Sequence, residues 1–343
     1  MKVPFTWKPT GWFMVAWSGE IAAGTVKPLK YFGGHQVAYR TEDGRLNVLD
    51  AHCPHLGAHL GHRGKVKEDC IVCPYYGWGY GPDGVNRFIP YEDRPNVSHR
   101  LRVWPVVERH GCVFVWHDPA GGPPRWELPD LFTVVDHLPA DPKDYYPPYP
   151  QMSVKYEGEP VHPQITLENA PDTVHFEHVH GATVTPRLLH WEVDRPFYKG
   201  IGGFPVPLPD GGERMALKNH SISCGVGGAY SIFEGSYHYR LIFFTTPVDD
   251  ATSDMFYSIW WPRDPATRAM WCPSDTASGR RSSSSRRSPT TSRSGGTRST
   301  SRRRRSPSRT PFRTARCANG PGSSTSCPSD VHPRRTAVTM RAG

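Results

Sequence analysis

Two short segments near the amino end carry cysteine and histidine at spacings suited to a metal cluster. The first reads Cys53-Pro-His-Leu-Gly-Ala, the second reads Cys73-Pro-Tyr-Tyr-Gly-Trp, and 17 residues separate His55 from Cys73. Two loops of this kind can hold a two-iron two-sulfur cluster, with thiolates on one iron and imidazoles on the other. Neutral imidazole in place of thiolate removes negative charge, which raises the reduction potential and lets the cluster pass single electrons onward.

This pair of loops resembles the Rieske signature, in which Cys-x-His is followed at this distance by Cys-x-x-His. The resemblance implies Cys53, His55 and Cys73 as cluster ligands, and it places Tyr76 where the fourth ligand, a histidine, is expected. A phenolate is a hard oxygen donor, and it lacks the second ring N–H through which a histidine ligand passes on an electron. We therefore expect cluster binding and electron transfer to be impaired. The codons for His and Tyr differ by a single base, so one point change accounts for the substitution.

Two other interpretations of the same loops stay open. A zinc site uses similar donors, although the spacing suits it less well, and two unrelated surface loops could carry Cys and His by chance. Cys70 falls outside the ligand set and is expected to be a buried strand cysteine. His52, His59 and His62 are expected to be loop residues that bind no metal.

A second group of donors lies mid-chain, between Asn169 and His180. Two imidazoles and a carboxylate on one face of a metal leave positions open for dioxygen and substrate, which is the arrangement of non-haem Fe(II) oxygenases. The segment resembles the Asn-x-x-Asp-x-x-His-x-x-x-x-His pattern of Rieske oxygenases. The resemblance implies His175 and His180 as iron ligands and Asp172 as the carboxylate that orients His175 and links the site to a neighbouring subunit's cluster. His178 is expected to be no ligand, and without the preceding loops the run could be a polar helix face.

The carboxylate ligand should follow roughly a hundred residues later by family resemblance, where this chain is instead rich in Arg and Ser. Residues 271–343 hold 16 Arg, no Lys and two acidic residues, whereas the preceding 270 residues hold 25 basic and 30 acidic side chains. The net charge of +9 therefore comes from the tail. Such a composition cannot bury a core and predicts disorder. A nucleic-acid-binding arm is the alternative.

A shifted reading frame explains this tail. The shifted frame joins the last base of each codon to the first two of the next. It lets 287–300 yield Leu-Ala-Asp-Asp-Leu-Glu-Ile-Trp-x-His-Gln-Val-Tyr, and it lets 315–326 yield Ala-Leu-Arg-Glu-Trp-Ala-Arg-Gln-Phe-Tyr-Leu. Both strings resemble the C-terminal helices of the family, including its carboxylate ligand. We therefore interpret everything after about Met270 as a frameshift product.

The elements that must position these groups fall into two parts. β-rich runs separated by turn residues cover Trp12–Trp17, Val37–Tyr39, Leu46–Leu49, Leu101–Val107 and Val113–Trp116. After a Pro/Gly-rich joint come an expected helix near Leu167–His180 and strands at Tyr230–Phe233, Tyr237–Thr245 and Met255–Trp261. We predict an α+β protein: an all-β Rieske domain (1–120), a truncated helix-grip-like catalytic domain with mononuclear iron (121–270) and a disordered tail (271–343).

Further segments narrow the resemblance to the oxygenase components of 3-ketosteroid 9α-hydroxylases. They are Gly11-Trp-Phe, Ile89-Pro-Tyr-Glu-Asp-Arg-Pro, Val115-Trp-His and Pro129-Asp. The resemblance implies a monooxygenase that hydroxylates a hydrophobic, steroid-like substrate with O2 in a homotrimer. Its electrons would come from NADH through an FAD-containing reductase. The stretch 204–239, which should line the substrate pocket, is Gly-rich and departs more from the family. A Rieske electron carrier and a catalytically dead remnant are the alternative functions.

Composition also limits where the protein can be located and which partners it can have. No stretch approaches the roughly 18 consecutive apolar residues of a membrane span, and the first ten residues lack the apolar core of a signal peptide. We therefore expect a cytoplasmic protein with no membrane partner and, since the body is mildly acidic, no nucleic-acid partner. Eight cysteines in so long a chain favour metal ligation over a disulfide framework.

Overall fold

A computed structural model of the chain describes residues 5–235 and 238–263, all within one compact unit, Met1–Trp271. The predicted disorder of the tail, the frameshift interpretation of 271–343 and the expected carboxylate ligand lie outside the described residues. No helix in the described ranges is long and apolar enough to cross a membrane.

The first part is built from three small antiparallel sheets, ordered β1-β10-β9, β2-β3-β4 and β5-β6-β7-β8. The strands are β1 (Gly11–Trp17), β2 (Val26–Tyr31), β3 (Gly34–Arg40), β4 (Leu46–Asp50), β5 (Lys65–Lys67), β6 (Cys70–Val72), β7 (Gly79–Tyr80), β8 (Asn86–Phe88), β9 (Val106–Arg109) and β10 (Cys112–His117), with one 3-10 turn, η1 (Ser18–Glu20). Four of the five predicted strands fall inside β1, β3, β4 and β10. The fifth prediction, Leu101–Val107, is wrong over most of its length, since β9 begins only after Pro105, which has no N–H to donate.

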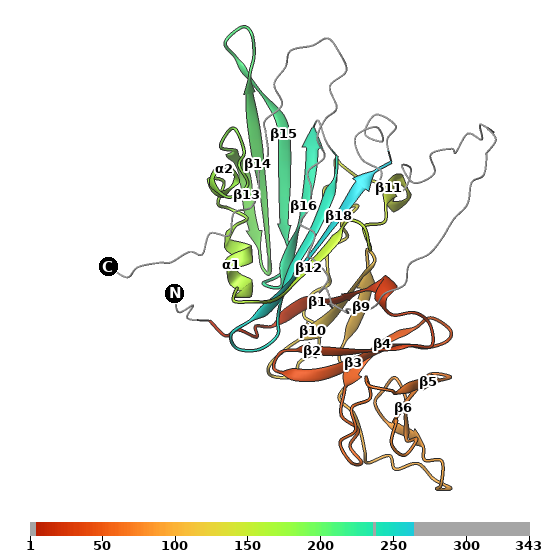
Figure 1. Cartoon of the computed structure of the whole chain (residues 1–343). Coiled ribbons are helices and arrows are strands. Elements are labelled where there is room, and N and C mark those ends of the chain that lie inside the picture. Colours follow the sequence, from red (N-terminus) through yellow and green to blue (C-terminus); the bar gives the residue numbers. More distant parts are fainter. Residues whose placement is uncertain (1–4, 236–237, 264–343) are drawn as a thin grey trace, which may run out of the picture. The chain divides into compact units, whose positions relative to one another are not determined.

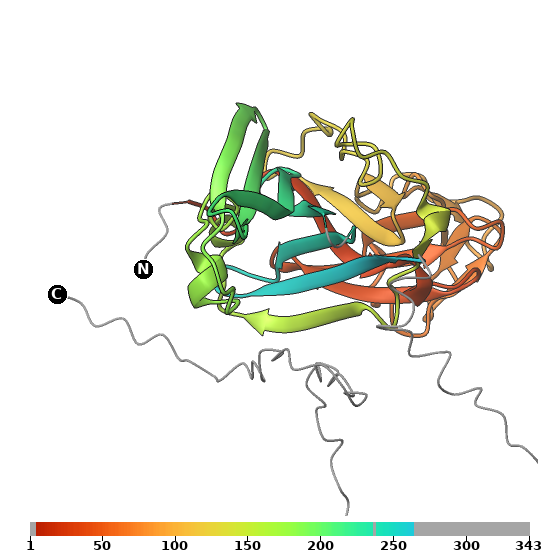
Figure 2. The same cartoon turned by 90° about the horizontal axis from the view of Figure 1, so that it is seen from above.

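The second part contains one large antiparallel sheet in the order β11-β18-β17-β16-β15-β14-β13, with β12 also paired to β18. Its elements are η2 (Pro142–Asp144), β11 (Tyr145–Tyr146), β12 (Ser153–Glu159), α1 (Pro163–Glu168), α2 (His175–His178), β13 (Arg187–Asp194), β14 (Phe197–Pro207), β15 (Glu213–Ser223), β16 (Gly228–Gly235), β17 (Arg240–Pro247) and β18 (Ser253–Pro262). Figure 1 shows β13 to β18 as neighbouring strands, and in Figure 2 the sheet is curved. The predicted all-β part followed by an α+β part is confirmed.

The helix expected near Leu167–His180 is wrong as one continuous element. It is replaced by two short helices, α1 and α2, that are separated by six residues. Pro171 explains the break, because proline removes a helical donor and disfavours helical backbone in the residue before it. The histidine-bearing segment is therefore a single helical turn with a bend on its amino side.

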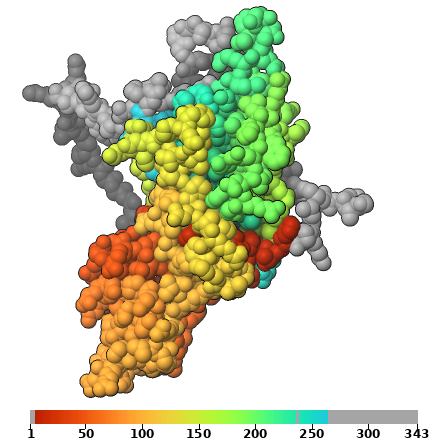
Figure 3. Space-filling view, turned by 180° about the vertical axis from the view of Figure 1, so that it is seen from behind, coloured from red at the N-terminus to blue at the C-terminus, as the bar shows by residue number. Residues whose placement is uncertain are grey.

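One hydrophobic core joins strands of both parts. The indole of Trp17 on β1 donates a 2.8 Å hydrogen bond to the hydroxyl of Ser258 on β18, and the Thr246 hydroxyl donates to the Met14 carbonyl. The segment after β10 lies against the strands of the large sheet (Figure 3), where the buried Arg240 donates to the carbonyls of Leu131 and Leu138. A second, smaller core surrounds the Cys53 and Cys73 loops.

Candidate functional site

The two cysteine loops have the same local structure. The Cys53 N–H donates to the Ala58 carbonyl, and the Gly57 N–H donates back to the Cys53 carbonyl, both at 2.9 Å. Cys73 repeats the pattern with Trp78 and with Gly77, at 2.9 and 3.0 Å. Gly57 and Gly77 have φ angles of 75° and 71°, in the left-handed region that glycine adopts without strain. Each glycine therefore closes a tight turn that directs the cysteine side chain into the second core.

The loops bring the two predicted thiols together. Cys53 and Cys73 are 2% and 4% exposed, belong to the same small core, and lie close enough for each thiol to be the main influence on the pKa of the other. The Cys73 thiol, the Tyr80 hydroxyl at 3.2 Å and the N–H groups of His55 and Leu56 lower the pKa of Cys53 to about 5. The pKa of Cys73 is raised, since it retains the proton that the pair shares. This environment suits a thiolate, and hence a metal.

Tyr80 was not among the residues predicted from the sequence. No motif spacing marks it. It reaches Cys53 because β7 pairs with β6, placing Tyr80 opposite Ile71. A hydroxyl donor to a ligand sulfur is the kind of contact that tunes a cluster's potential.

Of the two positions where histidine ligands are expected, one holds His55 and the other holds the phenol of Tyr76. The His55 ring stacks on Trp78 at 4.4 Å between centroids and meets the edge of Tyr76 at 5.0 Å. Trp78 is fixed by a 2.8 Å hydrogen bond from its indole to the Tyr91 hydroxyl. Tyr76 is 48% exposed, so it stands beside His55 at the open side of the loops. Three of the four donor positions therefore fit a Rieske cluster and the fourth does not.

The mid-chain histidines also lie together. The rings of His175 and His180 are 5.2 Å apart between centroids, and Phe176 between them packs against Phe204 of β14 at 5.3 Å. The Nδ1–H of His175 donates to the main-chain carbonyl of Asp172, which leaves Nε2 free to bind a metal. Partial withdrawal of the ring from water and the neighbouring His175 lower the pKa of His180, so its imidazole is neutral at neutral pH.

Asp172 contacts the helical turn in a way that differs from the expected one. Its carboxylate accepts hydrogen bonds from the N–H groups of Val174 and His175 at 3.0 and 3.4 Å. The main-chain carbonyl of Asp172 orients the His175 ring instead. Within the described ranges, no third His, Cys or carboxylate completes a metal-binding group with His175 and His180.

Comparisons with known proteins find two domain families that match successive parts of the chain. Residues 11–105 match the Rieske 2Fe-2S domain family, and residues 115–283 match the 3-ketosteroid 9alpha-hydroxylase C-terminal domain family. A crystal structure of dicamba monooxygenase bound to dicamba superposes with a TM-score of 0.57 at 19% identity, covering 77% of this chain and 82% of that one. At that identity the likeness concerns the fold alone.

Relatives with assigned activities are similar over part of their length. Cholesterol 7-desaturase nvd 1 of Ciona intestinalis is 32% identical over 189 residues, which cover 53% of this chain and 38% of the relative. The oxygenase component of 3-ketosteroid-9-alpha-monooxygenase from Rhodococcus rhodochrous is 32% identical over 172 residues, covering 50% and 43%. The chain spans less than half the length of these curated relatives. The chain therefore combines a Rieske [2Fe-2S] domain with a 3-ketosteroid 9alpha-hydroxylase C-terminal domain, in the order expected from the sequence, and this pair of domains identifies it by family as an oxidoreductase.

Proposed function

We propose that this chain is the oxygenase component of a Rieske-type monooxygenase that hydroxylates a hydrophobic, steroid-like substrate. The observation that carries the proposal is the presence, in one chain, of paired thiols cradled by backbone amides and of two neighbouring imidazoles, His175 at the start of α2 and His180 just after it. When bound, the cluster would supply single electrons and the iron would supply a position for O2. Cys53, His55 and Cys73 would hold the cluster, and His175 and His180 the iron.

The sheet face beside α2 supports a hydrophobic substrate. Strand pairing sets Phe204 opposite Leu217, and sets Asn219 opposite Phe233. Side chains two residues apart along a strand share a face, so these four lie on the side of the sheet that Phe176 of α2 contacts. The buried Asn219 has an amide oxygen without a hydrogen-bond partner. An apolar wall with one polar group suits a substrate that is mostly hydrocarbon with few oxygen atoms.

The proposal also includes an electron donor and an assembly, both taken from the family resemblance. An NADH-dependent reductase containing FAD would deliver electrons to the cluster, and a homotrimer would bring the cluster of one subunit to the iron of the next. Asp172 is exposed, and its carboxylate binds only N–H groups of its own turn among the described residues. It is therefore accessible to a second copy of the chain.

A second candidate is a catalytically inactive member of the family. Tyr76 favours it, because this residue replaces an imidazole at the cluster, and so does the lack of a third ligand for His175 and His180 among the described residues. Both defects can be repaired. Tyr76→His restores the fourth cluster ligand, and translating the codons after Met270 in the shifted frame restores the predicted carboxylate helix.

The experiment compares the chain as written, the Tyr76→His variant and the doubly repaired chain. Each is reconstituted anaerobically with iron and sulfide, and the reduced cluster is measured by EPR. We expect a normal Rieske signal from both chains with His at 76 and not from the chain as written. Tyr75→His is the matched control, since Tyr75 is the exposed neighbour in the same loop, and it should give no such signal.

Turnover is then measured with a ketosteroid, O2, NADH and a flavin reductase, and the product is detected by mass spectrometry as one added oxygen atom. The doubly repaired chain should hydroxylate the steroid, and the chain as written should not. A repaired chain that holds cluster and iron yet leaves every steroid unchanged would overturn the steroid assignment. Full turnover by the unrepaired chain would show that neither Tyr76 nor the sequence after Met270 impairs activity.

A further inference from the structure

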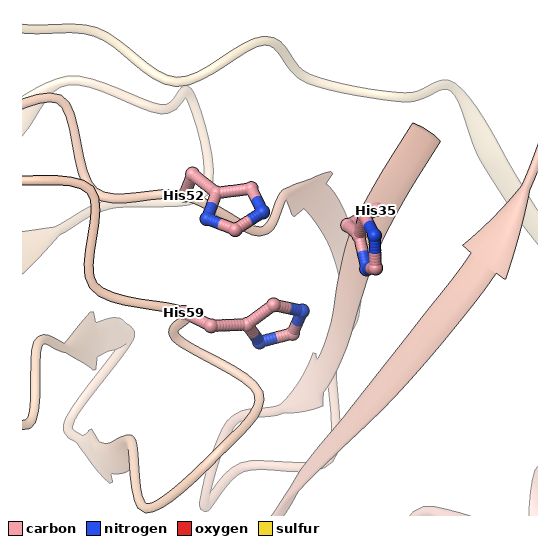
Figure 4. Close-up of side chains that lie close together, drawn as sticks. All are labelled: His35, His52 and His59. Carbon is pink, nitrogen blue, oxygen red and sulfur yellow. The ribbon is translucent and has the colours of Figure 1, made fainter. Parts of the chain in front are cut away.

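Three histidines outside both sites converge at the base of the first cysteine loop (Figure 4). His35 lies on β3, while His52 and His59 flank the loop that carries Cys53 and His55. An antiparallel bridge pairs His52 with His59, and the Ala51 N–H donates to the His35 carbonyl at 3.0 Å. Backbone contacts therefore hold all three residues in place.

The ring nitrogens of the three side chains face one another. One ligand atom from each residue lies within 4.8 Å of the other two, and the three ring centroids are separated by 5.1 to 5.5 Å. Figure 4 shows the rings of His52 and His59 turned so that one nitrogen of each points toward His35. A single ion at the centre would be within reach of all three after small side-chain rotations.

Hydrogen bonds fix two of the rings. The Nδ1–H of His52 donates to the Gly57 carbonyl at 3.1 Å, which leaves a lone pair on Nε2, and a metal-binding histidine usually makes this kind of bond. The Nδ1 of His59 accepts the Gly61 N–H at 3.1 Å. Coordination through the other nitrogen of His59 would shift its ring proton and give up that one hydrogen bond, a small loss beside a metal–nitrogen bond.

The charge of the group also favours a cation. Partial burial and the neighbouring His62, His52 and His35 lower the pKa of His59 to about 4, so its ring is neutral at neutral pH. Across the described ranges, no acidic side chain forms an ion pair with His35, His52 or His59. Imidazole nitrogen is a ligand that suits zinc, nickel and copper, whereas calcium and magnesium take carboxylate and carbonyl oxygens.

We propose that His35, His52 and His59 form a binding site for a divalent transition-metal ion, of which zinc is the representative. The fourth position is open to water or to His62, whose ring lies 4.3 Å from that of His59. The ion would join β3 to both ends of the Cys53 loop and so stiffen the loop. The site depends on neither the cluster nor the mononuclear iron.

The test is calorimetric titration of the full-length chain with Zn²⁺ and, in parallel, with Co²⁺ followed by its visible spectrum. His35→Ala, His52→Ala and His59→Ala should each remove one binding event or weaken it by more than about 100-fold, the upper end for loss of a residue that only supports a ligand. His190→Ala is the matched control, since it removes an exposed histidine on β13, and it should bind as the parent chain does.

The Co²⁺ spectrum separates this site from the thiols. The event lost in the three variants should lack a sulfur-to-cobalt charge-transfer band, and any event at Cys53 and Cys73 should retain one. Circular dichroism checks that each variant is folded, and a rise in Tm on adding Zn²⁺ to the parent chain, reduced in the variants, provides a second measure. Identical binding by the parent, the three variants and the control would overturn the proposal, whatever the outcome of the cluster reconstitution.

Discussion

At the scale of single residues, burial decides which histidines can take up a proton. His110 lies in the turn between β9 and β10, and its Nε2 accepts the Leu131 N–H at 3.0 Å. Burial lowers the pKa of this imidazole to about 4, outweighing the nearby Asp130 carboxylate, which raises it. The folded chain therefore binds a proton at His110 less readily than the unfolded chain does.

This difference predicts a pH dependence of stability. The folded-state pKa is below the unfolded value of about 6.5, so the unfolded chain binds the extra proton first as the pH falls. The contribution of His110 is fully present above about pH 6.5 and is lost toward pH 4. Between pH 7 and pH 5 the free energy of unfolding should fall by about 2 kcal/mol more in the parent chain than in His110→Gln.

Urea unfolding at the two pH values measures the difference. Glutamine can still accept the Leu131 N–H, so the variant isolates the titration from the hydrogen bond. Equal loss of stability in both chains would show that His110 is protonated without cost in the folded state.

At the scale of elements, α2 is too short to be stable by itself and depends on packing. Its four residues His175–His178 are held by the contact of Phe176 with Phe204 on β14 and by hydrogen bonds to Asp172. The positions of His175 and His180 therefore depend in part on this aromatic contact with the sheet.

Removing that contact should loosen the histidine pair. An aromatic pair contributes about 0.5–1.5 kcal/mol, so Phe176→Ala should weaken Co²⁺ binding at His175 and His180 by up to about tenfold. Val179→Ala is the control, because Val179 is 70% exposed in the same segment. Co²⁺ affinity is measured by spectroscopic titration; an effect of the same size in both variants would assign the loss to general loosening of the segment.

At the scale of the whole described unit, Arg240 connects the large sheet to the segment that follows β10. Its buried guanidinium donates to the Leu131 and Leu138 carbonyls and, at 3.3 Å, to the Tyr145 hydroxyl. The charge also lies 5.4 Å from the centre of the Phe132 ring. This one side chain therefore donates to two main-chain carbonyls and one hydroxyl of the segment that follows β10.

Arg240→Leu should therefore destabilise the fold strongly. The variant loses hydrogen bonds from a charged donor and leaves the Leu131 and Leu138 carbonyls without that donor. We therefore expect the free energy of unfolding to fall by about 3–5 kcal/mol. Arg214→Leu makes the same chemical change at an exposed position of β15 and should change stability by less than about 0.5 kcal/mol. Denaturant unfolding compares the two; a small effect at Arg240 would mean that water replaces its hydrogen bonds.

Much of the candidate site could be predicted from the sequence because its donors are local. The geometry of the Cys-Pro-x-x-Gly turns and of the Asp172–His180 segment is set by residues close together in the sequence. Residue types and spacing were therefore enough to select Cys53, Cys73 and the histidine pair. Runs of β-forming residues bounded by turn residues likewise predicted β1, β3, β4 and β10 of the first part, while β2 and the short strands β5 to β8 were missed. The continuous helix failed because one proline outweighed the apparent pattern.

Contacts between distant segments were decided only by the tertiary structure. Tyr80 reaches Cys53 through pairing of two short strands, and His35 joins His52 and His59 because β3 runs past the ends of the loop. The sequence determined which groups could act as ligands, since donor chemistry belongs to the side chain itself. Strand register and packing determined which of them meet, because proximity between residues far apart in the chain is set by the energy of the whole core.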